Sequence, residues 1–246
     1  MASLIEKPLE ISKNHFWLKI RAESAYALPG QFINIRPHTG NSPLIRRPIS
    51  VFNYGNGIIE LIIQLVGKGT ELLSSHPVGE IDIIGPLGNP FSLPQNSRLL
   101  LAGGGVGNAP LYYLALELKK NGNDITYIYG ARSADYIFFE EKYRETSDDF
   151  ILMTDDGSKG TKGFATKAAA DISEPEKFDI VYACGPHNMM KTLAEIMAAA
   201  PHIEVSMENY FACGIGLCSG CVVQTSTGPK RACVEGPVMD GKSILW

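Results

Sequence analysis

The fold is decided by one stretch, Leu99-Leu100-Leu101-Ala102-Gly103-Gly104-Gly105-Val106-Gly107-Asn108-Ala109-Pro110. Its apolar first half, its glycine-rich middle and the helical segment at 111–120 have the order of a buried strand, a tight loop and a helix. Glycines in such a loop let the backbone approach a pyrophosphate, and the helix N-terminus favours the negative charge of that group. Pro110 stands where the third glycine of the usual dinucleotide fingerprint is expected, so a plain turn between strand and helix remains possible.

The apolar run at 99–116 is about long enough to cross a membrane as a helix. Gly103, Gly104, Gly105, Gly107 and Pro110 would break that helix in the middle, so we predict no membrane contact. The chain of 246 residues has a net charge of -4 and no basic footprint, which argues against nucleic-acid binding. The N-terminus lacks the apolar core of a signal peptide, and we expect a cytoplasmic location.

Two kinds of periodicity lie on either side of the glycine-rich stretch. From there on, apolar strands are expected at 99–102, 125–129, 150–153 and 180–183, alternating with helices such as 111–120 and 189–199, which predicts a parallel sheet flanked by helices. Before it, β-branched runs at 15–22, 31–36, 49–52, 58–66 and 81–84 predict a small antiparallel β-barrel. The tail lacks long periodic runs, so a ligand must organise it. We therefore expect a barrel at 1–95, an α/β domain at 96–206 and a small module at 207–246.

The tail carries the sharpest chemical signal. Cys213-x4-Cys218-x2-Cys221 is followed after eleven residues by Cys233, which is the spacing of plant-type 2Fe-2S ligation. Glycines between these cysteines let the backbone curl tightly and point its amides at the sulfurs. A structural zinc site is the competing interpretation, although such sites usually contain two short Cys-x2-Cys pairs. The fifth cysteine, Cys184, follows an expected strand and is better explained as a small buried hydrophobic residue.

A second phosphate signal lies inside the expected barrel. Arg46 and Arg47 precede Pro48-Ile49-Ser50, and Gly67-Lys68-Gly69-Thr70 opens a short helical stretch about twenty residues later. Arginine can clamp a diphosphate, and a helix start supplies amide donors to the same anion. Taken alone, the arginines would suit an ordinary solvated edge strand, but the combination favours a nucleotide site.

Motifs along nearly the whole chain resemble one family. They are similar to the ferredoxin-reductase-like flavoproteins and, among these, to the electron transfer subunits of dihydroorotate dehydrogenase B. The tail motifs are the most specific part of this resemblance. The matching segments are Arg47-Pro48-Ile49-Ser50, Gly85-Pro86-Leu87-Gly88-Asn89, the loop at 103–107, Thr154-Asp155-Asp156-Gly157-Ser158, Cys184-Gly185-Pro186, Ser206-Met207-Glu208, Ala212-Cys213-Gly214-Ile215-Gly216 and Arg231-Ala232-Cys233-Val234-Glu235-Gly236-Pro237-Val238.

The resemblance implies FAD in the barrel, NAD at the glycine-rich loop and a 2Fe-2S cluster in the tail. Arg47 would hold the FAD pyrophosphate, and Ser50 would lie near the reactive nitrogen of the flavin ring. No protein acid or base is required, so no catalytic residue is expected. The FAD residues would be Arg47, Pro48, Ile49, Ser50, Ile62, Ile63, Gln64, Gly69 and Thr70. The NAD residues would be Gly103, Gly104, Gly105, Gly107, Cys184, Gly185 and Pro186. The cluster ligands would be Cys213, Cys218, Cys221 and Cys233.

The resemblance also implies a partner. In the family, an FMN-containing catalytic subunit oxidises dihydroorotate, and its electrons cross the cluster and FAD of the second subunit to NAD+, a step of pyrimidine biosynthesis. FAD is the necessary converter, because nicotinamide moves two electrons as hydride while the cluster moves one. A heterotetramer with two copies of each subunit is expected. This chain alone should not oxidise dihydroorotate.

Other functions remain open at this point. Related subunits serve bifurcating transhydrogenases, sulfide dehydrogenases and hydrogenases; in the transhydrogenase type an aspartate can replace one cluster cysteine, so four cysteines favour the dihydroorotate-linked family. A stand-alone reductase and a zinc-stabilised binding module are also compatible with the sequence. NAD is preferred over NADP only by resemblance, because Asp124 and Asp135 both lie near the position expected for a ribose contact and neither stands out.

Overall fold

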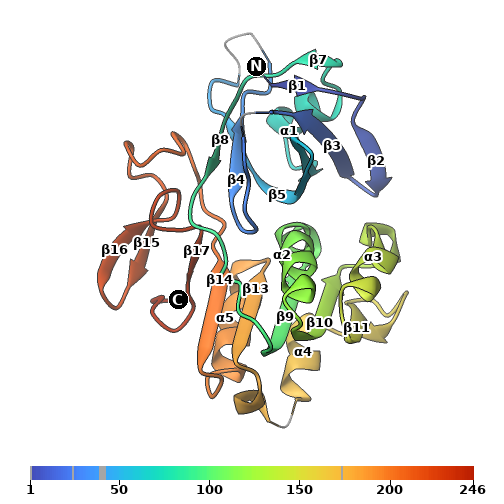
Figure 1. Ribbon diagram of the computed structural model, residues 1–246, viewed down its shortest axis with the longest axis vertical. Helices are drawn as coiled ribbons and strands as arrows, with labels where there is room; N and C mark the ends of the chain where they lie inside the picture. The colour runs from blue at the N-terminus through green and yellow to red at the C-terminus, as the bar shows by residue number, and fades with distance from the viewer. Residues whose placement is uncertain (1, 24, 39–42, 173) are drawn as a thin grey trace.

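The computed structural model describes residues 2–23, 25–38, 43–172 and 174–246, arranged as two sheets with a small third unit beside them (Figure 1). The first sheet has eight antiparallel strands in the order β7-β1-β3-β6-β5-β4-β8, with β2 paired to β3. Its strands are β1 (Ser3–Leu4), β2 (Leu9–Ser12), β3 (His15–Arg21), β4 (Phe32–Ile35), β5 (Arg47–Gly55), β6 (Ile58–Gln64), β7 (Gly79–Glu80) and β8 (Ile83–Leu87), and helix α1 (Lys68–Ser74) follows β6.

This first sheet curls because its register shifts at several points. Irregular pairing occurs in β2, in β4 between Phe32 and Asn34, and in β5 between Val51 and Asn53. Such bulges bend a strand and increase its twist, which wraps the sheet into a half-barrel. Apolar side chains fill the interior, among them Leu18, Ile20 and Leu73 of α1. The expected antiparallel barrel is confirmed in this curled, open form.

The second sheet has seven strands in the order β12-β11-β10-β9-β13-β14-β17. All neighbouring pairs except β14 and β17 are parallel. The expected parallel sheet is therefore confirmed. The elements are β9 (Arg98–Gly104), α2 (Asn108–Lys120), β10 (Asp124–Ala131), α3 (Glu140–Glu145), β11 (Asp149–Thr154), β12 (Thr161–Lys162), α4 (Ala165–Ala170), β13 (Ile180–Cys184), α5 (His187–Ile196) and β14 (His202–Ser206), with 3-10 turns η1 (Gly105–Gly107), η2 (Ala134–Tyr136) and η3 (Pro175–Lys177).

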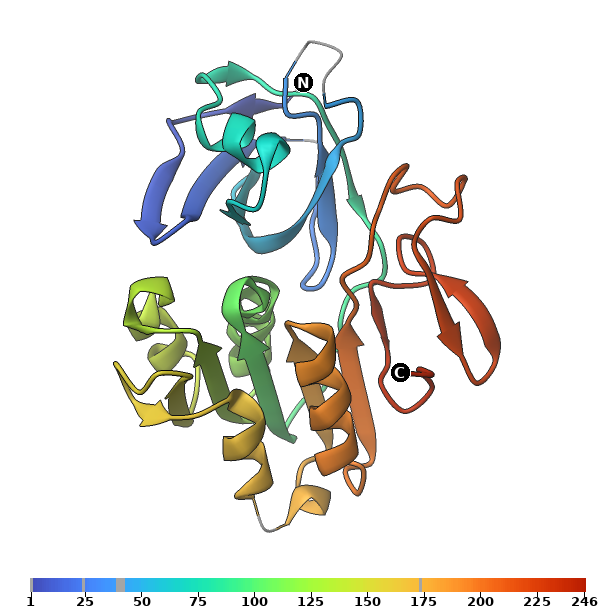
Figure 2. The same cartoon turned by 180° about the vertical axis from the view of Figure 1, so that it is seen from behind.

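Helices cover both faces of this sheet. Side chains of α2 and α3 share one apolar core with Phe52 of the half-barrel, whereas α4 and α5 pack on the opposite face (Figure 2). Pro110 lies in the first turn of α2, where a backbone N–H needs no partner within the helix, so the residue that departs from the sequence fingerprint is compatible with the helix. Within the described part of the chain, no helix is long and apolar enough to span a bilayer.

The tail joins the second sheet. Strands β15 (Val222–Thr225) and β16 (Gly228–Arg231) form a hairpin, and β17 (Val238–Asp240) then pairs antiparallel with β14. Figure 1 shows the tail beside both the half-barrel and the parallel sheet. Strand β17 is not predictable from the sequence, because three residues are too few for a periodic pattern. Part of the tail is thus organised by backbone pairing with β14 and by burial of Val238 and Met239.

The half-barrel and the parallel sheet pack through aromatic side chains. Phe52 of β5 stacks on Tyr112 of α2 with ring centroids 4.7 Å apart, and the hydroxyl of Tyr113 donates to the carbonyl of Ala27. A second contact is made by His15 of β3, whose ring packs against Tyr136 and Phe138. These contacts fix the half-barrel over the amino-terminal end of α2.

The buried ring of His15 makes this packing dependent on pH. Burial lowers the pKa of His15 below its ordinary value of 6.5. The unfolded chain therefore binds a proton more readily, so the stability contributed by His15 is full above about pH 6.5 and falls as the pH drops below that value. We expect a melting temperature that decreases from about pH 7 to about pH 5 and a smaller decrease in a His15→Phe variant. Equal slopes in thermal melts of the two proteins would contradict this origin.

Candidate functional site

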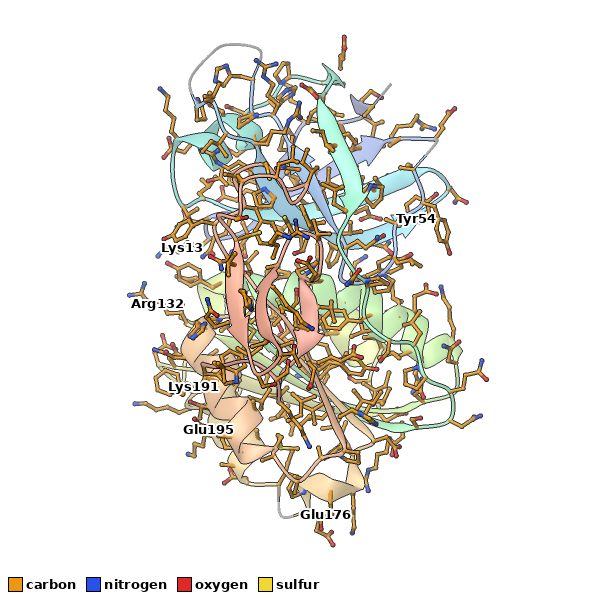
Figure 3. The ribbon with its side chains drawn as sticks, turned by 90° about the vertical axis from the view of Figure 1, so that its left-hand side faces the viewer. Lys13, Tyr54, Arg132, Glu176, Lys191 and Glu195 are labelled. Carbon is orange, nitrogen blue, oxygen red and sulfur yellow. The ribbon has the colours of Figure 1, made fainter. Side chains whose placement is uncertain are left out.

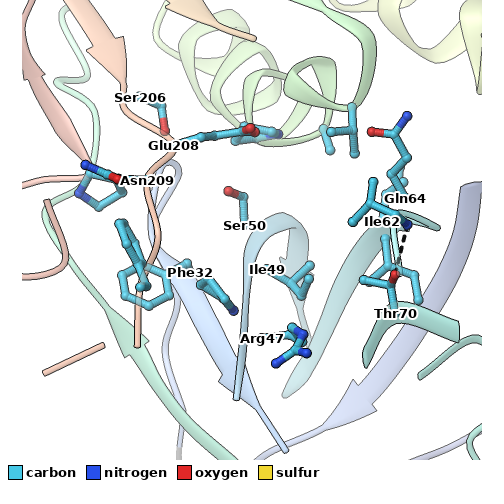
Figure 4. Close-up of a pocket in the computed structure, with 18 of the residues that line it drawn as sticks. Phe32, Arg47, Ile49, Ser50, Ile62, Gln64, Thr70, Ser206, Glu208 and Asn209 are labelled. Atoms are coloured by element: carbon cyan, nitrogen blue, oxygen red, sulfur yellow. Dashed lines mark hydrogen bonds between the residues drawn. The ribbon is translucent and has the colours of Figure 1, made fainter. Parts of the chain in front are cut away.

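A cavity of about 310 Å³ lies where the half-barrel, the start of α2 and the tail meet (Figure 4). The half-barrel supplies one wall through β5 and β6. The first turn of α2 and the residues after β14 supply the others. The lining consists of Phe32, Arg47, Pro48, Ile49, Ser50, Ile62, Ile63, Gln64, Val66, Thr70, Val106, Ala109, Pro110, Ser206, Met207, Glu208, Asn209, Phe211 and Pro237.

The structure brings together the residues expected at a flavin. All of them line this cavity except Gly69, which lies behind Arg47. A Cβ added at Gly69 would be 2.2 Å from Nε of Arg47, so only glycine leaves room for the guanidinium to lie across the backbone of α1. Arg47 also donates to the carbonyl of Ile45. The side chain of Thr70 holds the turn before α1 by accepting from the backbone N–H of Val66 at 3.0 Å.

The opposite wall of the cavity is polar and comes from the end of β14 and the segment that follows it. Ser206 and Glu208 point toward the space that Ser50 enters from the half-barrel (Figure 4). Burial among protein atoms raises the pKa of the Glu208 carboxyl above its ordinary value, although the side chain borders the open cavity. Nearby, burial raises the pKa of the Cys184 thiol, and the charge of Glu208 adds to this effect. The cavity therefore has a cationic end at Arg47 and a carboxyl at the other side.

A second cavity of about 440 Å³ lies at the carboxyl ends of β9, β10, β11 and β13. Gly104, Gly105 and Pro186 line it, together with Arg132 and Asp155. Burial raises the pKa of Asp155, and the neighbouring acidic side chain at 156 contributes to the same shift. In open α/β sheets this edge is the usual place for a nucleotide.

Other residues expected at NAD lie behind this cavity. A Cβ at Gly107 would be 2.4 Å from the carbonyl oxygen of Cys184, and one at Gly103 would be 2.0 Å from Oδ1 of Asn108. A Cβ at Gly185 would lie 2.8 Å from the Cε atom of the methionine at 189. These three glycines, with Cys184, do not line the cavity. Gly107 and Gly185 allow the loop after β9 and the loop after β13 to pack closely together, and Gly103 leaves room for the side chain of Asn108.

A groove continues from this cavity toward the half-barrel. Arg132 and Asp155 belong to both, and the groove adds Lys13, Tyr136 and Asp156. Lys13 from the half-barrel and Arg132 from the sheet extend on the same side of the molecule (Figure 3). Neither Arg132 nor Asp155 is among the site residues expected from the sequence. Each directly follows a parallel strand, which is the signal that would have found them.

Three of the four tail cysteines lie in the loop at 213–221, and the fourth lies in the turn at 232–237. Cys221 and Cys233 are buried, Cys213 is half-buried and Cys218 is exposed. The N–H of Cys233 donates to Sγ of Cys221 at 3.5 Å, and the N–H of Gly220 donates to Sγ of Cys218 at 3.4 Å. Backbone amides, that of residue 215 foremost, lower the pKa of the Cys213 thiol to about 6. Burial raises the pKa of Cys233 to about 12.

This donor set fits an iron-sulfur cluster. Cys213 interacts with Cys218, and Cys233 interacts with both Cys221 and Cys213, so the thiols form one connected group. In the part of the chain that the structure describes, no three His, Cys, Asp or Glu side chains already stand as ligands of a single metal ion. Amides directed at sulfur stabilise thiolates, which is what a cluster requires.

An ion pair stabilises the loop at 213–221, the cluster loop, from its outer side. Arg231 pairs with Glu235 and also donates to the carbonyl of Gly216 at 2.8 Å. The guanidinium lowers the pKa of the Glu235 carboxyl to about 2. The turn that carries Cys233 is therefore tied to the loop that carries Cys213 and Cys218.

Comparison with known proteins decides the family. The model described as "Iron-sulfur cluster binding domain of dihydroorotate dehydrogenase B" matches residues 208–245, and "Oxidoreductase NAD-binding domain" matches residues 101–195. The "Dihydroorotate dehydrogenase B (NAD(+)), electron transfer subunit homolog" of Thermotoga maritima is 39% identical over 250 residues, covering 98% of this chain and 87% of that protein. The electron transfer subunit of Desulforamulus reducens is 36% identical, covering 96% and 94%. The chain belongs to the dihydroorotate dehydrogenase B electron transfer subunit family.

A solved structure is also similar over the full chain. It is described as "Insights into flavin-based electron bifurcation via the NADH-dependent reduced ferredoxin-NADP oxidoreductase structure", with a TM-score of 0.89 and 36% identity. The match covers 100% of this chain and 90% of that one. The resemblance seen in the sequence motifs and the expected fold class are thereby confirmed.

Several cavity residues of this family member were not expected from the sequence. Ser206, Met207 and Glu208 belong to a motif that marks the resemblance, but the motif alone does not place them at a cofactor. Their position at the carboxyl end of β14, the last parallel strand, is the signal that would have placed them at a site. Phe32 and Pro237 carry no such signal, because their place in the cavity depends on packing between distant segments.

Proposed function

We propose that the chain is the electron transfer subunit of a dihydroorotate dehydrogenase B. It passes electrons from the FMN of a catalytic partner through a 2Fe-2S cluster and FAD to NAD+. The observation that carries this proposal is the lining of the 310 Å³ cavity. Strand β5, the start of α2 beside the glycine-rich loop, and the segment leading to Cys213 all contribute to it. A flavin in this cavity would face the nucleotide edge on one side and the cluster loop on the other.

The residues of the chain would bind and orient the cofactors. Arg47 supplies the cation for the FAD pyrophosphate, with Pro48, Ile49, Ser50, Ile62, Ile63, Gln64 and Thr70 around the flavin and Gly69 keeping Arg47 in place. Gly104, Gly105 and Pro186 border the space for NAD, and Gly103, Gly107, Cys184 and Gly185 shape the loops behind it. Cys213, Cys218, Cys221 and Cys233 would ligate the cluster. Bound FAD supplies the chemistry that links hydride transfer to single-electron transfer.

The partner is proposed from the names of the relatives. Relatives at 36% and 39% identity are electron transfer subunits of dihydroorotate dehydrogenase B or homologues of them, which supports a catalytic subunit of that enzyme as the partner. A heterotetramer with two copies of each subunit, a cytoplasmic location and the division after residues 95 and 206 are parts of the same proposal. The tail strand β17 lies within the second sheet, so the module at 207–246 would depend on the α/β domain for its structure.

A second candidate function is the flavoprotein subunit of a bifurcating NADH-dependent reduced ferredoxin-NADP oxidoreductase. It is favoured by the solved structure with a TM-score of 0.89 and 36% identity. The two candidates share the cofactors of this chain and differ in the partner.

The test is anaerobic copurification of the chain with its native partners. FAD, iron, sulfide and FMN are then measured per chain, and dihydroorotate-dependent NAD+ reduction is assayed. One FAD and two irons per chain, with FMN on a second subunit and dihydroorotate activity, are expected for a 2Fe-2S flavoprotein of this family. Flavin and iron with a different partner and no such activity would favour the second candidate. Zinc without flavin would refute both.

A further inference from the structure

We infer that Asn34 of the half-barrel is a positioning residue for Cys213, the first ligand of the proposed cluster. The inference rests on the proposed function, because it requires that the tail cysteines hold a cluster. It assigns a role to a side chain that lies far from the cysteines in sequence.

Asn34 is a buried polar residue of the half-barrel, and its side chain forms a hydrogen bond that leads out of the half-barrel to the tail. Its side chain is 0% exposed, and its Nδ2 donates to the backbone carbonyl of Cys213 at 3.2 Å. Its Oδ1 is buried and has no hydrogen-bond partner among the described residues. A half-satisfied buried amide costs stability relative to an apolar side chain of the same size. The one hydrogen bond that it does make leads to the cluster loop.

A second contact reinforces the first one. Phe32 and Asn34 are two residues apart on β4, and both reach the tail from that strand. Phe32 packs against Phe211 with ring centroids 5.0 Å apart, two residues before Cys213. Both phenylalanines also line the flavin cavity. Strand β4 therefore holds the segment at 211–213 through two contacts, one apolar and one polar, and sets the place of Cys213 relative to that cavity.

A glycine in the cluster loop leaves room for the side-chain amide of Asn34. Gly214 has a φ of +73°, and a Cβ added there would lie 2.5 Å from Nδ2 of Asn34. Cys213 is the one cysteine of the four whose own carbonyl is hydrogen-bonded to a half-barrel strand in the described residues. The contact can thus be broken from either side, by changing Asn34 or by filling the space at Gly214.

Outer residues that orient metal ligands typically change metal affinity by about 10–100-fold when they are replaced. The full chain is purified anaerobically as wild type, Asn34→Leu and Gly214→Ala. The control Asn53→Leu removes a half-barrel amide that donates to Glu60 instead of the tail. The control Gly228→Ala places an alanine at another positive φ of the tail, where a Cβ meets nothing within 4 Å. FAD content, the EPR spectrum and midpoint potential of the reduced cluster, and the rate of iron loss to a chelator are measured for each protein.

Asn34→Leu and Gly214→Ala are both expected to retain FAD, shift the EPR spectrum and potential, and lose iron about tenfold faster than wild type. Asn53→Leu and Gly228→Ala are expected to match wild type. If Asn34→Leu does not fold, Gly214→Ala decides, because it leaves β4 unchanged. Wild-type spectra and iron loss in Gly214→Ala would overturn the inference, as would the same result in a folded Asn34→Leu. Absence of iron from the wild-type chain would instead refute the proposed function.

Discussion

Replacing Cys221 by serine is expected to abolish the iron signal of the chain while most of its FAD remains bound. Cys221 is 1% exposed, and its Sγ accepts a hydrogen bond from the backbone N–H of Cys233. Four thiolates are needed for a plant-type 2Fe-2S cluster, and a buried serine hydroxyl is a poor substitute. Arg47 and the strands β5 and β6, which line one wall of the flavin cavity, belong to the half-barrel and are not altered by this change.

The measurement is iron and sulfide per chain, the EPR spectrum after reduction, and FAD released on denaturation. Cys184→Ala is the matched control, because Cys184 is also buried but lies on β13 outside the connected thiol group. It is expected to keep its iron. An intact cluster in Cys221→Ser would mean a different ligand set, and loss of iron in Cys184→Ala would extend that set to the parallel sheet.

The parts of the fold that can be predicted from the sequence are those with local patterns. The strands around 99–102, 125–129, 150–153 and 180–183 are predictable because parallel strands buried on both faces are continuous apolar runs. Strand β14 escapes prediction although it is parallel, since His202 and Glu204 interrupt its apolar pattern. Strands β1 and β7 are two residues long each and have no periodicity to detect.

The same distinction applies to the site. Cysteine spacing is a local pattern, and a glycine-rich turn after a strand is another, so both can be recognised in the sequence. The contact of Asn34 with Cys213 joins residues 179 positions apart, and neither position carries a local signal of it. The role of Gly69 is similar, because its closeness to Arg47 follows from how α1 packs across β5. Contacts of this kind depend on the folded chain.

Gly69→Ala is expected to weaken FAD binding strongly without unfolding the half-barrel. The added methyl group would lie 2.2 Å from Nε of Arg47, so the guanidinium must leave its place over α1. The guanidinium is the flexible end of a long side chain, so the fold accommodates this movement at little cost. A hydrogen bond to a charged group is worth about 1.5–3 kcal/mol, which corresponds to roughly 10–150-fold in the dissociation constant of FAD.

Gly67→Ala in the same turn is the matched control, because a Cβ there meets nothing within 4 Å. Its FAD affinity, measured by fluorescence titration of the apoprotein, should equal that of wild type, and Arg47→Ala should weaken binding at least as much as Gly69→Ala. If the glycine acts only through the arginine, the double variant Arg47→Ala/Gly69→Ala binds FAD as Arg47→Ala does. Additive losses would mean that Gly69 contacts the cofactor itself. Equal affinity of Gly69→Ala and wild type would mean that Arg47 does not depend on Gly69, and equal affinity of Arg47→Ala and wild type would remove Arg47 from the pyrophosphate site.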